Sequence, residues 1–176
     1  MNHEPKAMNL EPSIVVIGLG DPLRGDDGLG WYAVDRLAET FHSKDIEFLK
    51  YRELLPEVSE KISRAEYVLF VDASVKSQAT EQKGKGGAID EMKIVPSENN
   101  SSLETHKLDP AGLLAFSSAL YGKAPEAIML MARGESFEYH EGISKGVQRA
   151  AQLLVNRACE IANNWLEELW SAPLKQ

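Results

Sequence analysis

One stretch near the start of the chain, residues 14–37, constrains the fold more than any other part of the sequence. It opens with four apolar β-branched residues at 14–17, a run typical of a buried strand. Gly18 and Gly20 interrupt this run, and apolar residues at helical spacing follow from residue 29 to residue 37. A strand, a glycine-containing loop and a helix in this order form the first half of a βαβ unit. The stretch therefore predicts an α/β fold, in which ligands bind beyond the carboxyl ends of the strands.

The rest of the chain continues the alternation of strand and helix. Strands are predicted over residues 13–19, 45–50, 67–71, 88–96 and 127–132, and helices over residues 27–41, 56–64, 110–121 and 144–169. We expect a three-layer α/β sandwich, with a mostly parallel sheet of about five strands and helices on both faces. The hairpin-like segment 75–96, whose first part is a polar, glycine-rich loop, is expected to place one strand antiparallel. A single domain is predicted over residues 13–170, between tails at 1–12 and 171–176.

Composition limits the functions that such a domain can have. The net charge of −8 and the absence of a basic arm argue against nucleic-acid partners and anionic membranes. The single cysteine, Cys159, excludes an internal disulfide framework and lies in an apolar helical stretch, so we expect a core thiol. No apolar run approaches the ~20 residues that span a bilayer, and the first residues show no signal pattern. A cytoplasmic location is therefore expected.

Polar side chains capable of chemistry follow several of the predicted strands. They are Asp21, Asp26 and Asp27 after the first strand, Asp72 after the third, His106 and Asp109 before the third helix, and His140 after the last strand. Two carboxylates and an imidazole at one edge can bind a divalent metal or carry out acid–base chemistry. Without a thiolate, nickel, zinc and manganese are all compatible with such a set.

Each of these residues also has a structural interpretation. An Asp at a helix start is often the N-cap, and only one of Asp26 and Asp27 is needed for that role. Asp72 can cap a local turn, and a histidine in a polar loop is often simply solvated. The two early glycines resemble a dinucleotide fingerprint, but Leu23 stands where the third glycine is required. Nucleotide binding is therefore not expected.

Four segments together carry a resemblance to a known family. They are GLGDPLRGDDGLG at 18–30, FVDAS at 70–74, THKLDPAGLLAF at 105–116 and ESFEYHEGIS at 135–144. In this order they resemble the hydrogenase maturation proteases, the endopeptidases that process the large subunit of nickel–iron hydrogenases. The resemblance spans residues 13 to about 160, nearly the whole predicted domain.

The resemblance implies a metal-binding trio of Asp27, Asp72 and His106. Its register selects the second acid of the tandem pair, Asp27, as the ligand and leaves Asp26 as the expected helix cap. Thr105 departs from the Pro or Ser that some members have before the histidine, and we expect little effect. The resemblance assigns no definite role to His140.

The implied activity is the removal of a short C-terminal peptide from a nickel-loaded large-subunit precursor. The Ni²⁺ ion would arrive with this substrate, so that nickel loading licenses cleavage. No serine or cysteine nucleophile stands in the motifs. Either the metal polarises the scissile carbonyl or activates water, or a carboxylate of Asp27 or Asp72 acts as general base, as in an aspartic or metal-associated peptidase.

Two other classes of function fit the same residues. One is a metal-dependent hydrolase of a small molecule, with its own tightly held ion. The other is a nickel-binding chaperone on the same fold, without catalytic activity.

Overall fold

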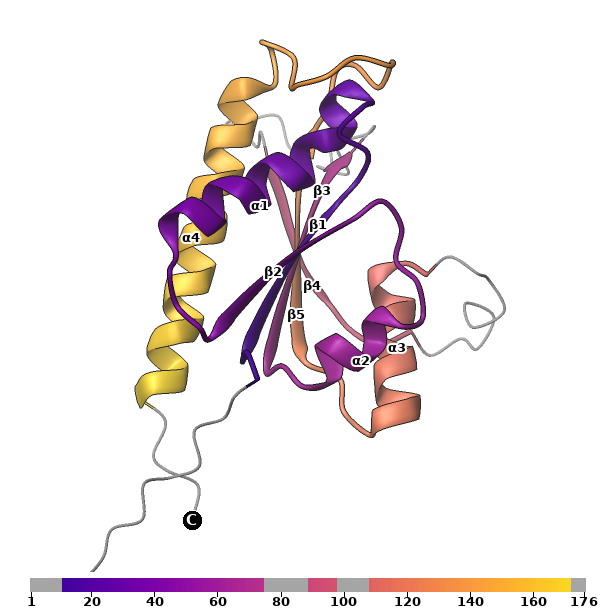
Figure 1. Ribbon diagram of the computed structural model, residues 1–176, viewed down its shortest axis with the longest axis vertical. Coiled ribbons are helices and arrows are strands. Elements are labelled where there is room, and N and C mark those ends of the chain that lie inside the picture. Colours follow the sequence, from indigo (N-terminus) through magenta and orange to yellow (C-terminus); the bar gives the residue numbers. More distant parts are fainter. Residues whose placement is uncertain (1–10, 75–88, 98–107, 172–176) are drawn as a thin grey trace, which may run out of the picture.

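A computed structural model describes residues 11–74, 89–97 and 108–171 of the chain. The strands in these residues are β1 (Ile14–Leu19), β2 (Ile46–Tyr51), β3 (Tyr67–Ser74), β4 (Ile89–Ile94) and β5 (Glu126–Arg133). The helices are the 3-10 helix η1 (Gly25–Gly28), α1 (Leu29–Thr40), α2 (Val58–Ser63), α3 (Pro110–Tyr121) and α4 (Gln148–Ser171). In Figure 1, α1 and α4 lie on one side of the sheet, and α2 and α3 lie on the other. The predicted three-layer α/β sandwich is confirmed.

The sheet of the described residues has the strand order β2-β1-β3-β5-β4. The pairs β1–β2, β1–β3 and β3–β5 are parallel, whereas β4 runs antiparallel to β5 at the edge. The antiparallel strand expected in this part of the sequence is confirmed. The polar loop expected before β4, residues 75–87, lies outside the described residues.

Alternate residues of the central strands enter two separate hydrophobic cores. Ile14 and Val16 of β1 pack with α1 and α4, whereas Val15 and Ile17 pack with α2 and α3. Both faces of β1 are therefore buried, which explains why its sequence is continuously apolar rather than alternating. Cys159 packs partly buried against the α1–α4 core, and burial raises the pKa of its thiol.

The third α-helix begins and ends where the sequence predicts. The carboxylate of Asp109 accepts a hydrogen bond from the Gly112 N–H at 2.6 Å, and Pro110 occupies the first turn. Gly122 ends the helix in the left-handed conformation at a φ of 70°. All three signals act within the helix itself, which is why the sequence suffices here.

Helices α1 and α4 lack the side-chain caps that the sequence predicts and start later than expected. Helix α1 begins at Leu29, after the 3-10 turn of η1, and Gly28 caps it without a side-chain hydrogen bond. The expectation that Asp26 or Asp27 caps this helix is therefore wrong. Helix α4 begins at Gln148 rather than at a Ser144 cap.

Close backbone contacts fix the start of α1 against the sheet. A Cβ atom on Gly30 would lie 2.4 Å from the carbonyl oxygens of both Leu19 and Val71. A Cβ atom on Gly18 would in turn lie 2.3 Å from the Gly30 carbonyl oxygen. Glycine at both positions lets α1 begin directly over the carboxyl ends of β1 and β3.

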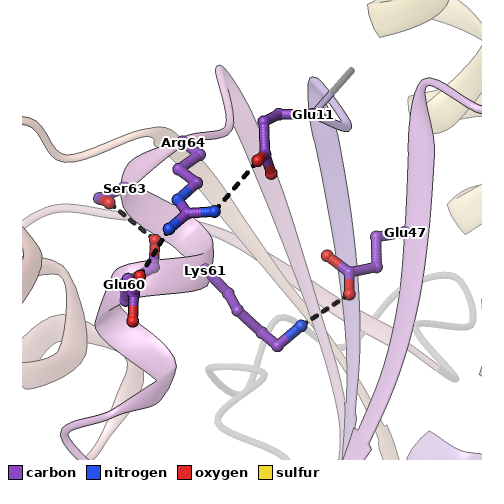
Figure 2. Close-up of polar contacts among 6 residues, drawn as sticks. All are labelled: Glu11, Glu47, Glu60, Lys61, Ser63 and Arg64. Atoms are coloured by element: carbon purple, nitrogen blue, oxygen red, sulfur yellow. Dashed lines mark hydrogen bonds and ion pairs between the residues drawn. The ribbon is translucent and has the colours of Figure 1, made fainter.

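Ion pairs gather at the opposite, amino end of the sheet. Figure 2 shows Arg64, which directly follows α2, paired with Glu11 and Glu60. It also shows Lys61 of α2 paired with Glu47 of β2. Glu11, expected within the N-terminal tail, is thus in contact with the domain, whereas residues 1–10 lie outside the described part. Among the helices described, none is long and apolar enough to cross a membrane.

Candidate functional site at the carboxyl edge of the sheet

Asp27 lies in η1, beside the end of β1. Its Oδ2 atom accepts a hydrogen bond of 2.9 Å from the backbone N–H of Asp21. Gly20 has a φ of 112°, and a Cβ atom there would lie 1.9 Å from the Asp27 carbonyl oxygen. Only glycine permits this approach, so the loop glycine sets the position of the half-buried carboxylate.

Asp72 lies on the neighbouring strand at the same edge. The sequence predicted that Asp72 follows this strand. Strand β3 instead continues to Ser74, so Asp72 lies within it. Gly18 is in register with Val71, which puts Asp72 level with Leu19 at the end of β1. Its Oδ1 atom accepts a hydrogen bond of 2.7 Å from the Ala73 N–H. Because η1 packs against β3, the structure brings Asp27 and Asp72 to one edge of the sheet.

The remaining sequence candidates divide into structural and undescribed residues. His106 lies outside the described residues, so its predicted place beside the two carboxylates stays a prediction. Asp109 serves as the cap of α3. Asp21 accepts a turn hydrogen bond from the Leu23 N–H at 3.0 Å and pairs with Arg52 at 3.4 Å. No cluster of three metal-ligating side chains occurs within residues 11–74, 89–97 and 108–171.

Asp26, expected as a helix cap, is instead a buried anchor for a distant loop. Its side chain is 0% exposed and accepts hydrogen bonds from the N–H groups of Glu135, Ser136 and Ser144 and from the Ser144 hydroxyl. Burial alone raises the pKa of this carboxyl group. The hydrogen bonds to its charged form outweigh that effect and hold the pKa below its usual value.

His140 belongs to the same loop and lies against η1. Its backbone carbonyl accepts a hydrogen bond of 2.8 Å from Gly25, and its Nε2 atom lies 3.1 Å from the Ser136 hydroxyl. Gly25 has a φ of 57°, and a Cβ atom there would lie 2.4 Å from the His140 Nε2. The imidazole is exposed and lies against Gly25, which is two residues before Asp27 in the chain.

Comparison with known proteins extends this picture. No protein-family model matches the sequence, and a search of curated proteins finds no significant match. Solved structures do match. The NiFe hydrogenase maturation protease HycI from Thermococcus kodakarensis KOD1 is 23% identical, with a TM-score of 0.62 over 86% of this chain and 92% of that one. The hydrogenase maturating endopeptidase HybD from E. coli is 21% identical, with a TM-score of 0.64 and the same coverage. A hydrogenase 2 maturation peptidase from a Thaumarchaeota archaeon is 20% identical, with a TM-score of 0.59 over 85% of this chain and 97% of that one.

The chain has the fold of the hydrogenase maturation proteases. The likeness covers 86% of this chain and 92% of each of the first two structures. The fold expectation drawn from the four sequence segments is confirmed.

This maturation-protease fold also holds a groove, whose lining includes Gly28, the residue after Asp27. The groove has a volume of about 560 Å³ and runs between the η1–α1 segment and the start of α4. Its walls include Gly25, Gly28, Trp31 and Tyr32 on one side, and Gly142, Ile143, Gln148 and Ala151 on the other. Sequence reasoning did not find this groove because its two walls are more than 100 residues apart along the chain.

Sequence reasoning also missed the role of Asp26. The tandem acids were a visible signal, but only one of them could be matched to the ligand pattern. The partners of the other acid, Glu135, Ser136 and Ser144, carry no local mark that links them to it.

Proposed function

We propose that this protein is an endopeptidase that removes a short C-terminal peptide from the nickel-loaded large-subunit precursor of a nickel–iron hydrogenase. The observation that carries the proposal is the likeness of the whole fold, over 86% of this chain, to HycI and HybD, both of them hydrogenase maturation proteases. Location in the cytoplasm, where such a precursor would be processed, belongs to the same proposal.

The proposed site consists of Asp27 and Asp72 with His106 as the third ligand. Carboxylate oxygens and an imidazole nitrogen are suitable ligands for nickel as well as for other divalent ions. The Ni²⁺ ion belongs to the substrate: the precursor holds it with its own ligands, and the three side chains of this chain complete its coordination. A precursor without nickel would then lack this link and bind more weakly.

A hydrogen bond at the carboxyl edge holds the Asp27 carboxylate in place for this role. Oδ2 of Asp27 is held by the Asp21 N–H, whereas its Oδ1 has no hydrogen-bond partner among the described residues. This arrangement fixes the side chain and leaves one oxygen for the substrate's metal or for a water molecule. Two routes to hydrolysis follow. In one, the substrate's metal polarises the scissile carbonyl; in the other, Asp27 or Asp72 removes a proton from the attacking water.

The test is incubation of the purified protein with a nickel-loaded precursor, followed by intact-mass measurement of the large subunit. We expect the mass to fall by that of a C-terminal peptide. Asp27→Asn and His106→Ala should remain folded and release no peptide. Glu47→Gln, which removes one negative charge at the other end of the sheet, is the matched control and should process normally.

Three outcomes would contradict parts of the proposal. An unchanged mass with wild-type protein would overturn the proposed reaction. Equal processing of precursor with and without nickel would remove the metal from the proposal. Normal processing by Asp27→Asn or His106→Ala would show that the site is assigned wrongly.

A further inference from the structure

We propose that Asp26 is a positioning residue, whose buried carboxylate fixes the loop of residues 134–144 against η1 and thereby orients Asp27. The inference rests on the proposed function, because Asp27 is the ligand that it positions. Asp26 itself is fully buried and touches no substrate. It would act only through the segment that it holds.

The hydrogen bonds of the carboxylate all come from one loop. Oδ2 accepts from the Glu135 N–H at 2.8 Å, the Ser136 N–H at 2.9 Å and the Ser144 hydroxyl at 2.9 Å. Oδ1 accepts from the Ser144 N–H at 2.7 Å. The donors come from the two ends of the loop, so a single side chain holds both ends in place.

Backbone hydrogen bonds link the same two segments. The Asp26 N–H donates to the Ser136 carbonyl at 2.9 Å, and the Gly25 N–H donates to the His140 carbonyl at 2.8 Å. Consecutive residues of η1 are therefore tied to the loop by both backbone and side chain. Asp27 follows directly, so the position of its backbone depends on these contacts. Figure 1 shows the loop before α4 and the segment before α1 at the same end of the molecule.

Gly134 and the Phe137 ring pack closely beside Asp26. A Cβ atom on Gly134 would lie 3.0 Å from the Asp26 Cβ and 2.6 Å from the Phe137 ring. Helix α1 receives no side-chain cap, so the carboxylate is not needed to begin that helix. A buried charge costs free energy unless its partners are all in place. A charge retained here, with every hydrogen bond directed at the loop, is explained by the need to hold that loop.

The test is the variant Asp26→Asn. Its amide oxygen can still face the three donors near Oδ2, but its NH₂ group then opposes the Ser144 N–H, so the loop loosens at one end. We expect kcat for precursor processing to fall roughly 10- to 100-fold, the loss that a misplacement of about 1 Å can cause, with KM nearly unchanged. Hydrogen exchange at the Ser144 and Ser136 amides should become faster.

Two further variants separate positioning from general stability. Glu91→Gln removes one charge from the ion pair that Glu91 of the edge strand β4 forms with Arg157 of α4. Compared at equal folded fraction, it should keep the wild-type kcat. Ser144→Ala removes only the hydroxyl donor, and kcat should fall by about twofold to fivefold, in proportion to one of the hydrogen bonds lost.

The results distinguish a failure of this inference from a failure of the proposed function. If Asp26→Asn and Glu91→Gln have the same kcat at equal folded fraction, Asp26 is merely structural and the inference is wrong. If Asp26→Asn does not fold, Ser144→Ala decides: unchanged kcat and unchanged amide exchange would overturn the inference. If wild-type protein processes no precursor, the proposed function fails. Hydrogen exchange in the variants then still shows whether Asp26 holds the loop.

Discussion

The two ends of the sheet hold their charged side chains in opposite ways. At the carboxyl end, Asp26 is fully buried and bound by backbone N–H groups from a distant loop. At the amino end, Arg64 and Lys61 project into solvent and pair with other side chains, as Figure 2 shows. Their side chains are 49% and 48% exposed.

This difference predicts a rigid carboxyl end and an amino end that tolerates substitution. Exposed ion pairs contribute little because solvent screens them and flexible side chains lose entropy in forming them. A buried carboxylate cannot be removed so easily, because its donors lose their only acceptor. The end that carries the candidate site should therefore respond strongly to small changes, whereas the amino end should not. Four substitutions test this comparison, from the largest expected effect to the smallest.

The first substitution is Asp26→Ala. It leaves three backbone N–H groups and a hydroxyl without their acceptor, so we expect the free energy of unfolding to fall by roughly 3 kcal/mol or more. Urea unfolding followed by circular dichroism measures the loss. Glu47→Ala at the amino end is the control and should change stability by less than about 1 kcal/mol. Equal losses in the two variants would remove the distinction between the ends.

The second substitution is Gly30→Ala, also at the carboxyl end. In an exposed helix this change stabilises by about 1 kcal/mol. Here the new Cβ atom would meet the carbonyl oxygens of Leu19 and Val71 at 2.4 Å, so α1 must move away from the sheet. We expect a destabilisation of about 1–3 kcal/mol, as for other overpacked sites. The sign of the change in urea midpoint is decisive, and an increase would show that the contact is not tight.

The third substitution is Arg64→Ala at the amino end. It removes the pairs with Glu11 and Glu60, and we expect a loss below about 1 kcal/mol because both pairs are exposed. The loss should shrink further in about 1 M salt, where the screening length is about 3 Å. Thermal unfolding at low and high salt measures both effects. A loss above about 2 kcal/mol, unchanged by salt, would mean that the amino end is as rigid as the site.

The sequence predicts features that depend on neighbours along the chain. The bounds of α3 follow from Asp109, Pro110 and Gly122, which all act within that helix. The shared edge of Asp27 and Asp72 follows from the rule that parallel strands end on the same side. The buried strands could also be predicted, because each appears as an apolar run of neighbouring residues.

The errors occur where contacts are long-range. Asp26 accepts a hydrogen bond from Glu135, 109 residues away, and this contact removes it from the capping role that its local sequence favours. Ser144 is drawn to the same carboxylate, so α4 begins later, at Gln148. No local pattern links these residues. The place of His106 and the nickel ion of the substrate stay predictions.

The smallest effect concerns Tyr67, which begins β3 at the amino end. Its hydroxyl donates a hydrogen bond of 2.7 Å to Glu168 of α4. This bond, with some burial, raises the pKa of Tyr67 to about 12, above its ordinary value of 10.0. Because the folded protein holds this proton more tightly, the contribution to stability is complete below pH 10 and is lost as the pH rises through 12.

Comparison of wild type with Tyr67→Phe isolates this contribution. Their difference in unfolding free energy should be constant up to about pH 9 and should decline toward about pH 11.5. Solvent screening of this exposed pair keeps the decline to a few tenths of a kcal/mol. Urea midpoints at both pH values measure it. A difference that stays constant would show that the hydrogen bond to Glu168 is not maintained in solution. A decline above about 2 kcal/mol would instead place a strongly coupled charge at the end described here as tolerant.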